Sequence, residues 1–110
     1  MKDFQLGEFE EIVLLTVAIL NDEAYGVSIK QEIEERLKRS VSVGALQSAL
    51  RRMESKGFLI SNLGEASSVR GGKRKRYFNI TDLGKKALAY ARDTRNQLWD
   101  AIPDFVLKMI

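Results

Sequence analysis

The stretch Arg70-Gly71-Gly72-Lys73-Arg74-Lys75-Arg76-Tyr77-Phe78-Asn79-Ile80 carries five cations and two glycines directly before an alternating aromatic segment. A glycine-containing charged run that passes into alternating apolar and polar residues predicts a turn followed by a β-strand. The outer surface of this turn is almost purely cationic, so phosphate is its expected counterpart. A solvated basic loop without a partner is the plainer interpretation.

A second strand-like run, residues 58–63, precedes this stretch. The polar residues 64–74 between the two runs include three glycines and two serines. Two short strands joined in this way predict a β-hairpin. Because two strands alone are not stable in water, we expect the hairpin to pack on helices.

Two helices are predicted upstream of the hairpin. Residues 24–39 repeat apolar side chains at every fourth position, and residues 42–56 repeat them at steps of three and four, with Ser42 as N-cap and Gly57 as the C-terminal stop. Two helices joined by a short turn and followed by a hairpin indicate a winged helix-turn-helix, with the hairpin as the wing.

The outward face of the second of these helices carries small, amide, hydroxyl and guanidinium side chains. Such groups reach base edges and phosphates when a helix lies in the major groove, and cations of a wing contact the backbone or the minor groove. We therefore predict DNA contacts from the helix by Ser42, Gly44, Gln47, Ser48, Arg51 and Arg52, and from the wing by Lys73, Arg74, Lys75 and Arg76.

The first and last helices are expected to pack on a second subunit. Residues 7–20 are apolar nearly all round, and the helix that begins at Thr81 or Asp82 and runs past Trp99 to Pro103 outgrows a core of this size. For the first helix, a role in the core alone is equally open. The predicted dimer interface comprises Phe9, Ile12, Leu15, Ala91, Thr94, Leu98, Ile102 and Phe105.

The predicted fold class is mostly α with a small β-hairpin. Residues 1–80 would form the winged helix-turn-helix DNA-binding domain, with the wing at about 58–80, and residues 81–110 a C-terminal dimerisation helix and tail in the same compact unit. The composition of the apolar tail, residues 105–110, does not decide whether it completes the dimer or binds another partner.

Charge is distributed unevenly along the 110 residues. Residues 1–35 hold two cations and nine carboxylates, a net charge of −7, whereas residues 36–86 hold thirteen cations and three carboxylates, a net charge of +10. Residues 87–110 hold three of each, which gives the overall +3. This asymmetry is typical of a nucleic-acid binder whose acidic part faces away from the ligand.

Several classes of function are disfavoured by composition. The chain has no cysteine and no histidine, which excludes disulfides, thiolate or imidazole metal sites and histidine-based acid–base catalysis. No nucleophile and base are placed to act together, so we expect neither an enzyme nor a metal or other cofactor. The sequence lacks an apolar run of membrane-spanning length and a signal peptide at residues 1–5, so we expect a cytoplasmic protein without a membrane partner.

The ordered motifs of the chain resemble the PadR family of bacterial transcriptional regulators, in its short form. The resemblance covers residues 6 to about 98 and rests on Leu6-Gly7-Glu8-Phe9-Glu10, Ala24-Tyr25-Gly26, Ser42-Val43-Gly44-Ala45-Leu46 with Leu50, Met53-Glu54-Ser55-Lys56-Gly57, the wing from Gly71 to Phe78, and Ile80-Thr81 with Gly84. It implies a homodimer held by the first and last helices that binds a pseudo-palindromic operator, with one recognition helix and one wing per half-site, and represses a nearby promoter. Gln47 departs from the family, which usually has tyrosine there.

Two interpretations remain open for Tyr25, for Trp99 and for the function of the whole chain. Tyr25, with the amides that open the second helix, could hold a DNA phosphate or could simply fill the core beside Ile29. The family resemblance implies that a flat aromatic effector could bind against Trp99, whereas packing at the subunit interface explains a tryptophan equally well. For the whole chain, the alternative function is a winged-helix module for protein–protein interaction without specific DNA binding.

Overall fold

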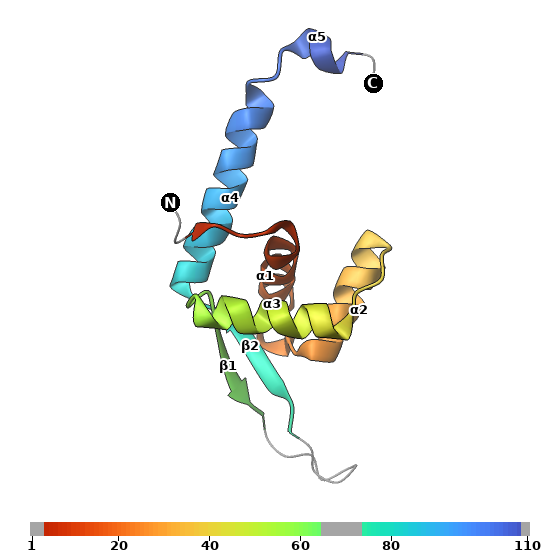
Figure 1. Ribbon diagram of the computed structural model, residues 1–110, viewed down its shortest axis with the longest axis vertical. Coiled ribbons are helices and arrows are strands. Elements are labelled where there is room, and N and C mark those ends of the chain that lie inside the picture. Colours follow the sequence, from red (N-terminus) through yellow and green to blue (C-terminus); the bar gives the residue numbers. More distant parts are fainter. Residues whose placement is uncertain (1–3, 65–73, 109–110) are drawn as a thin grey trace.

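A computed structural model describes residues 4–64 and 74–108 of the chain, and Figure 1 shows their arrangement. The elements are α1 (Glu8–Leu20), the 3-10 turn η2 (Asn21–Glu23), α2 (Gly26–Leu37), α3 (Val43–Ser55), β1 (Leu59–Leu63), β2 (Arg76–Ile80), α4 (Asp82–Asp100) and α5 (Asp104–Leu107). In Figure 1, α3 crosses in front of α1, the β1–β2 hairpin extends to one end of the molecule, and α4 extends toward the other. The predicted fold class, a winged helix-turn-helix followed by a long C-terminal helix, is confirmed.

The hydrophobic core lies where α1, α2, α3 and the hairpin meet. Its fully buried side chains come from the three helices and from Phe58, just before the hairpin: Val13, Leu14, Val17, Ile29, Ile33, Leu46, Leu50, Met53 and Phe58. α1 buries six of its thirteen residues, including two carboxylates, Glu10 and Glu11, while Leu15 and Ile19 stay 44% and 51% exposed. α1 therefore belongs to the core and also keeps an apolar edge that the described residues leave partly exposed.

The helix ends follow local hydrogen bonds. The Ser42 hydroxyl accepts from the Ala45 amide at 3.1 Å and confirms the predicted N-cap of α3, and the Thr81 hydroxyl accepts from the Gly84 amide at 3.0 Å at the start of α4. α2 is shorter than the predicted 24–39, because Tyr25 is extended and Lys38 takes a left-handed φ of 53°. α4 ends at Asp100, and Pro103 precedes the short α5.

The hairpin is antiparallel, with Leu59 opposite Ile80 and Leu63 opposite Arg76. The predicted strands covered residues 58–63 and 75–80, and each observed strand begins one residue later. Leu59 and Phe78 face the helices and are buried, whereas Ile60 and Leu63 are exposed. The Phe78 amide also donates to the Ala24 carbonyl at 2.8 Å, so the hairpin is attached to the start of α2 as well as to the end of α3.

A close contact at Phe58 joins α3, the wing and α4. Gly57 takes a φ of +84°, which turns the chain so that the Phe58 amide donates to the Met53 carbonyl at 2.9 Å. The Phe58 carbonyl then accepts from the Thr81 amide at 3.0 Å. A Cβ atom on Gly84 would lie 2.3 Å from that carbonyl oxygen and 2.8 Å from Ile80, so only glycine lets α4 begin this close to the strand.

We expect Gly84→Ala to lower the free energy of unfolding by more than about 2 kcal/mol, because its methyl group would push the Phe58 backbone away. Urea denaturation would measure the change. Gly44→Ala is the matched control: a Cβ there meets only the Ser42 hydroxyl at 3.8 Å, and alanine in a helix should leave stability unchanged or raise it by up to about 1 kcal/mol. Equal effects of the two substitutions would contradict the packing described at Phe58.

Candidate nucleic-acid interface

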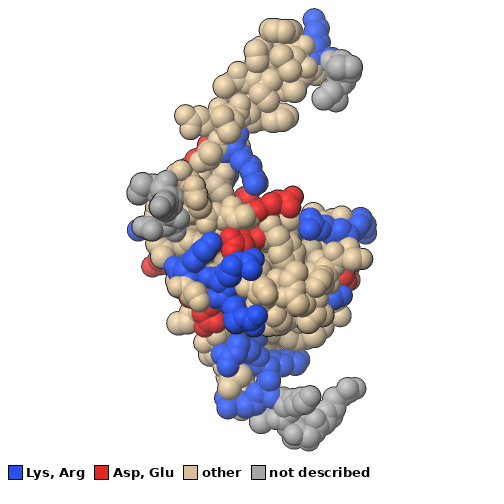
Figure 2. All heavy atoms as spheres, viewed as in Figure 1, with Lys and Arg blue, Asp and Glu red and all other residues tan. Residues whose placement is uncertain are grey.

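The outward face of α3 is exposed. Leu46, Ala49, Leu50 and Met53 are buried, which leaves the opposite side of the helix, with Gly44, Gln47 and Arg51, exposed and Ser48 half-buried. Figure 2 shows the Lys and Arg side chains gathered over α3 and continuing down over the wing. A continuous cationic surface on a protruding helix and hairpin is suited to the phosphate-lined grooves of duplex DNA.

Gln47 lies on the flank of α3 that faces the start of α2. A Cβ on Gly26 would be 3.3 Å from Gln47 Nε2, so the glycine makes room for the amide. Gln47 and Arg51 make no hydrogen bond or ion pair within the described chain, and their polar groups are therefore available to a ligand. A glutamine amide can bond adenine through two hydrogen bonds, and an arginine can do the same with guanine.

Tyr25 is half-buried between the start of α2 and the wing. Its ring packs edge-on against Tyr77, with 5.5 Å between centroids and 65° between planes, and Lys75 Nζ lies 4.4 Å from the centroid of the Tyr25 ring. Tyr25 and Tyr77 also form an isolated β-bridge. The residue thus packs against the wing, and its contact with a DNA phosphate stays a prediction.

Two of the described cations of the wing form hydrogen bonds across the hairpin. Arg74 donates from Nε to the Gly64 carbonyl at 2.6 Å, and Arg76 donates from one terminal nitrogen to the Ser61 hydroxyl at 3.1 Å, which in turn donates to Glu54 of α3 at 2.6 Å. All three cations, Arg74, Lys75 and Arg76, remain exposed. Lys73, together with Arg70, Gly71 and Gly72, lies outside the described residues.

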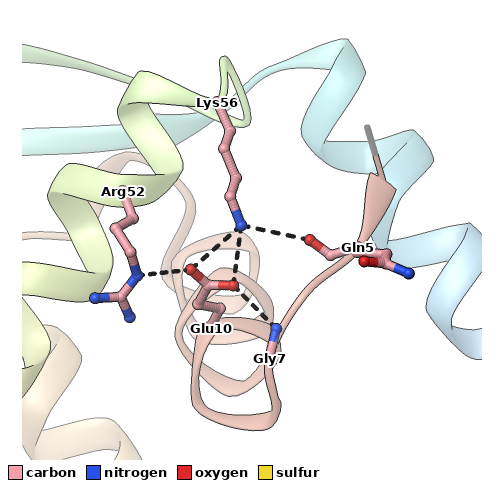
Figure 3. Close-up of polar contacts among 5 residues, drawn as sticks. All are labelled: Gln5, Gly7, Glu10, Arg52 and Lys56. Carbon is pink, nitrogen blue, oxygen red and sulfur yellow. Dashed lines mark hydrogen bonds and ion pairs between the residues drawn. The ribbon is translucent and has the colours of Figure 1, made fainter. Parts of the chain in front are cut away.

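Glu10 of α1 joins α3 to the N-terminal segment, as Figure 3 shows. Its carboxylate accepts from the Gly7 amide at 2.9 Å, from Arg52 Nε at 2.9 Å and from Lys56 Nζ at 3.2 Å. Lys56 also reaches the Gln5 carbonyl at 3.5 Å. Arg52, predicted to contact the groove, is therefore paired inside the protein, although its side chain stays 53% exposed.

Beside this cluster, a groove of about 520 Å³ is lined by Ser48, Arg51, Arg52, Ser55 and Lys56. Three cations and two hydroxyls can together accommodate an anion of the size of a phosphate. Sequence reasoning did not include Lys56 among the contact residues, although it follows Arg52 by four positions on one flank of the helix. Glu10 was also missed, because nothing in the sequence pairs it with residues some forty positions away.

The comparisons with known proteins agree with this geometry. The model of the Transcriptional regulator PadR-like family matches residues 14–90. The chain belongs to this family. A crystal structure of a PadR family transcription regulator from Clostridium difficile R20291 superposes with a TM-score of 0.64 at 30% identity, covering 86% of this chain and 97% of that one. The chain is thus a DNA-binding transcriptional regulator and not an enzyme.

Two further relatives cover most of the chain. A PadR-like transcription factor from Bacteroides fragilis has a TM-score of 0.71 at 25% identity over 84% of both chains. An uncharacterized protein of Lysinibacillus sphaericus is 36% identical over 89 residues, which are 79% of this chain and 77% of the relative. In the described parts of this PadR-like chain, no helix is long and apolar enough to cross a bilayer, and His, Cys, Asp and Glu side chains form no group suited to a metal ion.

The residues predicted at the dimer interface of this PadR-like chain fall into two groups. Phe9 and Ile12 are half-buried against their own core, and the Arg39 guanidinium lies 5.9 Å from the Phe9 ring centroid. The others belong to α1, α4 and the segment that follows it: Leu15 (44% exposed), Leu98 (68%) and Phe105 (76%), with Thr94 exposed and Ala91 and Ile102 half-buried. Trp99 is 61% exposed on the same helix.

A second groove, of about 770 Å³, lies between α1 and α4 and is lined among others by Leu15, Leu88, Arg92 and Arg95. Arg95 forms an ion pair with the buried carboxylate of Glu11 across it, with 2.6 Å between nitrogen and oxygen. The pair links α4 to α1, and the side chains of residues 92–100 of α4 are otherwise largely exposed.

The pKa of the Glu10 carboxyl reflects its contacts with Gly7 and with the two cations of α3 and the turn that follows it. Burial by itself would raise the pKa, but the Gly7 hydrogen bond and the contacts with Arg52 and Lys56 outweigh burial and hold it below the ordinary value of 4.5. A carboxyl whose pKa is lower in the folded state stabilises that state above its unfolded pKa. This contribution is lost as the pH falls through the folded pKa.

We therefore expect the free energy of unfolding to fall on acidification from about pH 5 to pH 3, and to fall less in Glu10→Gln, which has no carboxyl to protonate there. Chemical denaturation across that range would measure both slopes. Glu8→Gln removes the same charge from an exposed position on the same turn and should keep the wild-type slope. Identical slopes for wild type and Glu10→Gln would contradict the role given to Glu10.

Proposed function

We propose that the protein is a homodimeric repressor that binds a pseudo-palindromic operator. In each half-site, α3 lies in the major groove and the wing contacts the adjacent backbone or minor groove. The observation that carries this proposal is the outward face of α3, where Gln47 and Arg51 have no partner within the described chain and continue into the basic wing. Base edges are the partners that such unpaired amide and guanidinium groups fit best.

The dimer is supported by the surfaces that the single chain leaves open. Leu98, Trp99, Phe105 and Val106 expose between 52% and 76% of their surface at the far end of α4 and on α5. Apolar side chains along a helix that no other element covers indicate a protein interface. The groove between α1 and α4 is open to receive the α4 helix of a second subunit, and exchanging the same two surfaces produces two-fold symmetry.

Two-fold symmetry connects the dimer to its operator. Two α3 helices related by such an axis read inverted half-sites separated by one helical turn of DNA or a multiple of it. A dimer bound in this way across a promoter blocks transcription, which is the repression we propose, in the cytoplasm. A flat aromatic effector stacked on Trp99 between the subunits would change the spacing of the two α3 helices. The exposure of Trp99 supports this role and simple packing against the partner equally.

Selection of genomic fragments with the purified protein tests the proposed function. We expect an inverted repeat bound at least about a thousandfold more tightly than its scramble. For six to ten phosphate contacts, affinity should fall by about 10³ to 10⁵ between 50 and 200 mM salt. Equal and steeply salt-dependent binding of both duplexes would contradict specific regulation and would favour a protein-docking role for the winged helix.

Leu98→Asp should convert the dimer to a monomer, because the substitution places a charge within the proposed apolar interface. Analytical ultracentrifugation would show the change in mass, and operator affinity should fall with it. Leu37→Asp is the matched control, since Leu37 is 48% exposed at the end of α2, away from α4. A dimeric Leu98→Asp variant, or a monomeric wild type, would overturn the proposed interface.

A further inference from the structure

We propose that Glu10 is a specificity-determining residue, whose carboxylate directs Arg52 and restrains Lys56 so that the protein binds non-operator DNA less tightly. The inference rests on the proposed operator binding and deepens it. It assigns a role in DNA discrimination to an acidic residue of α1 that would not itself touch a base.

Three contacts and its burial hold the carboxylate in a fixed place. The side chain is 9% exposed and anchored by the Gly7 amide of its own helix start. Glu10 therefore cannot follow Arg52 or Lys56 outward when DNA approaches. The two cations, 53% and 42% exposed, lie at the border between this buried charge and the groove that Ser48, Arg51 and Ser55 complete.

The contact with Arg52 leaves part of the guanidinium group available. Glu10 accepts from Nε alone, and the two terminal nitrogens have no partner in the part of the chain that the structure describes. In Figure 3 these nitrogens point away from the carboxylate. A phosphate can therefore bond Arg52 without breaking its contact with Glu10, but only from the direction in which the terminal nitrogens point. Lys56, whose single nitrogen contacts Glu10 and the Gln5 carbonyl, offers less to a phosphate.

This geometry affects operator and non-operator DNA differently. Non-specific binding depends almost entirely on the number of phosphates that cations neutralise in any arrangement. A fixed carboxylate lies about 3 Å from two of those cations. Its negative charge weakens their attraction for phosphates that approach from other directions. In the operator complex, Gln47 and Arg51 fix the register of the duplex, so a phosphate can lie in the one direction that Arg52 leaves open. The carboxylate therefore lowers the affinity for the operator only slightly.

The test compares wild type, Glu10→Gln and Glu8→Gln on the fragment recovered by selection and on a scrambled duplex of equal length, by fluorescence anisotropy at several salt concentrations. Glu10→Gln should bind the scrambled duplex about three- to tenfold more tightly, with a salt slope steeper by about one to two units, since each added phosphate contact contributes about 0.9. The ratio of operator to scramble affinity should fall. Glu8→Gln, with the same change of net charge, should keep the wild-type ratio.

A Glu10→Gln variant that loses affinity for both duplexes alike, or keeps the wild-type ratio, would overturn the inference. The first result would mean that Glu10 only supports α3. In an Arg52→Gln, Lys56→Gln background, adding Glu10→Gln should no longer raise scramble affinity, and a persistent rise would also overturn it. If Glu10→Gln does not fold, Glu10→Asp, which keeps the charge but shortens the reach, should lower the ratio in the same direction, and an unchanged ratio would contradict the inference.

Failure of the proposed function has a different signature. A wild type that binds operator and scramble equally would refute operator recognition itself, whatever the variants do. A wild type that discriminates, together with a Glu10→Gln variant that discriminates equally well, would refute only the role of Glu10.

Discussion

The backbone contact between Phe58 and Gly84 fixes the three functional parts of this chain relative to one another. Phe58 lies between the turn after α3 and the start of β1. Its carbonyl accepts a hydrogen bond from the Thr81 amide, just before α4. The absence of a side chain at Gly84 lets α4 pass within van der Waals distance of that carbonyl. α3, the wing and α4, with its exposed apolar side chains, therefore meet at one buried residue. A small change in packing there would alter the position of all three.

The cations on α3 and the wing differ in the contacts that they make within the chain when no DNA is bound. Arg74 and Arg76 hold the hairpin together, Lys75 lies over the Tyr25 ring, and Arg52 and Lys56 are bound to Glu10. Arg51 has no such partner in the described chain. Side chains already held in one conformation lose less entropy when they bind phosphate, and they accept it from fewer directions. The interface thus combines preorganised cations with a few free polar groups on α3.

Much of the fold could be predicted from the sequence because its signals are local. The N-caps Ser42 and Thr81, the stop at Gly57 and the alternation of residues 76–80 each depend on neighbours a few positions away. The pairing of Glu10 with Arg52 could not be predicted, because it spans 42 positions and depends on how α1 packs on α3. The packing of Tyr25 on Tyr77 was missed for the same reason. The predicted length of α2 was wrong by two residues at each end, because Tyr25 is extended where it pairs with Tyr77 and Lys38 takes a left-handed conformation.

Hydroxyl-radical footprinting of the selected DNA fragment tests the central claim, that two copies of this chain read DNA symmetrically through α3 and the wing. The proposed dimer predicts two protected segments related by a two-fold axis, on one face of the duplex and about 34 Å apart or a multiple of that. Each segment should lose protection when Arg51 is replaced by glutamine. A single protected segment, or uniform weak protection along the whole fragment, would contradict the account.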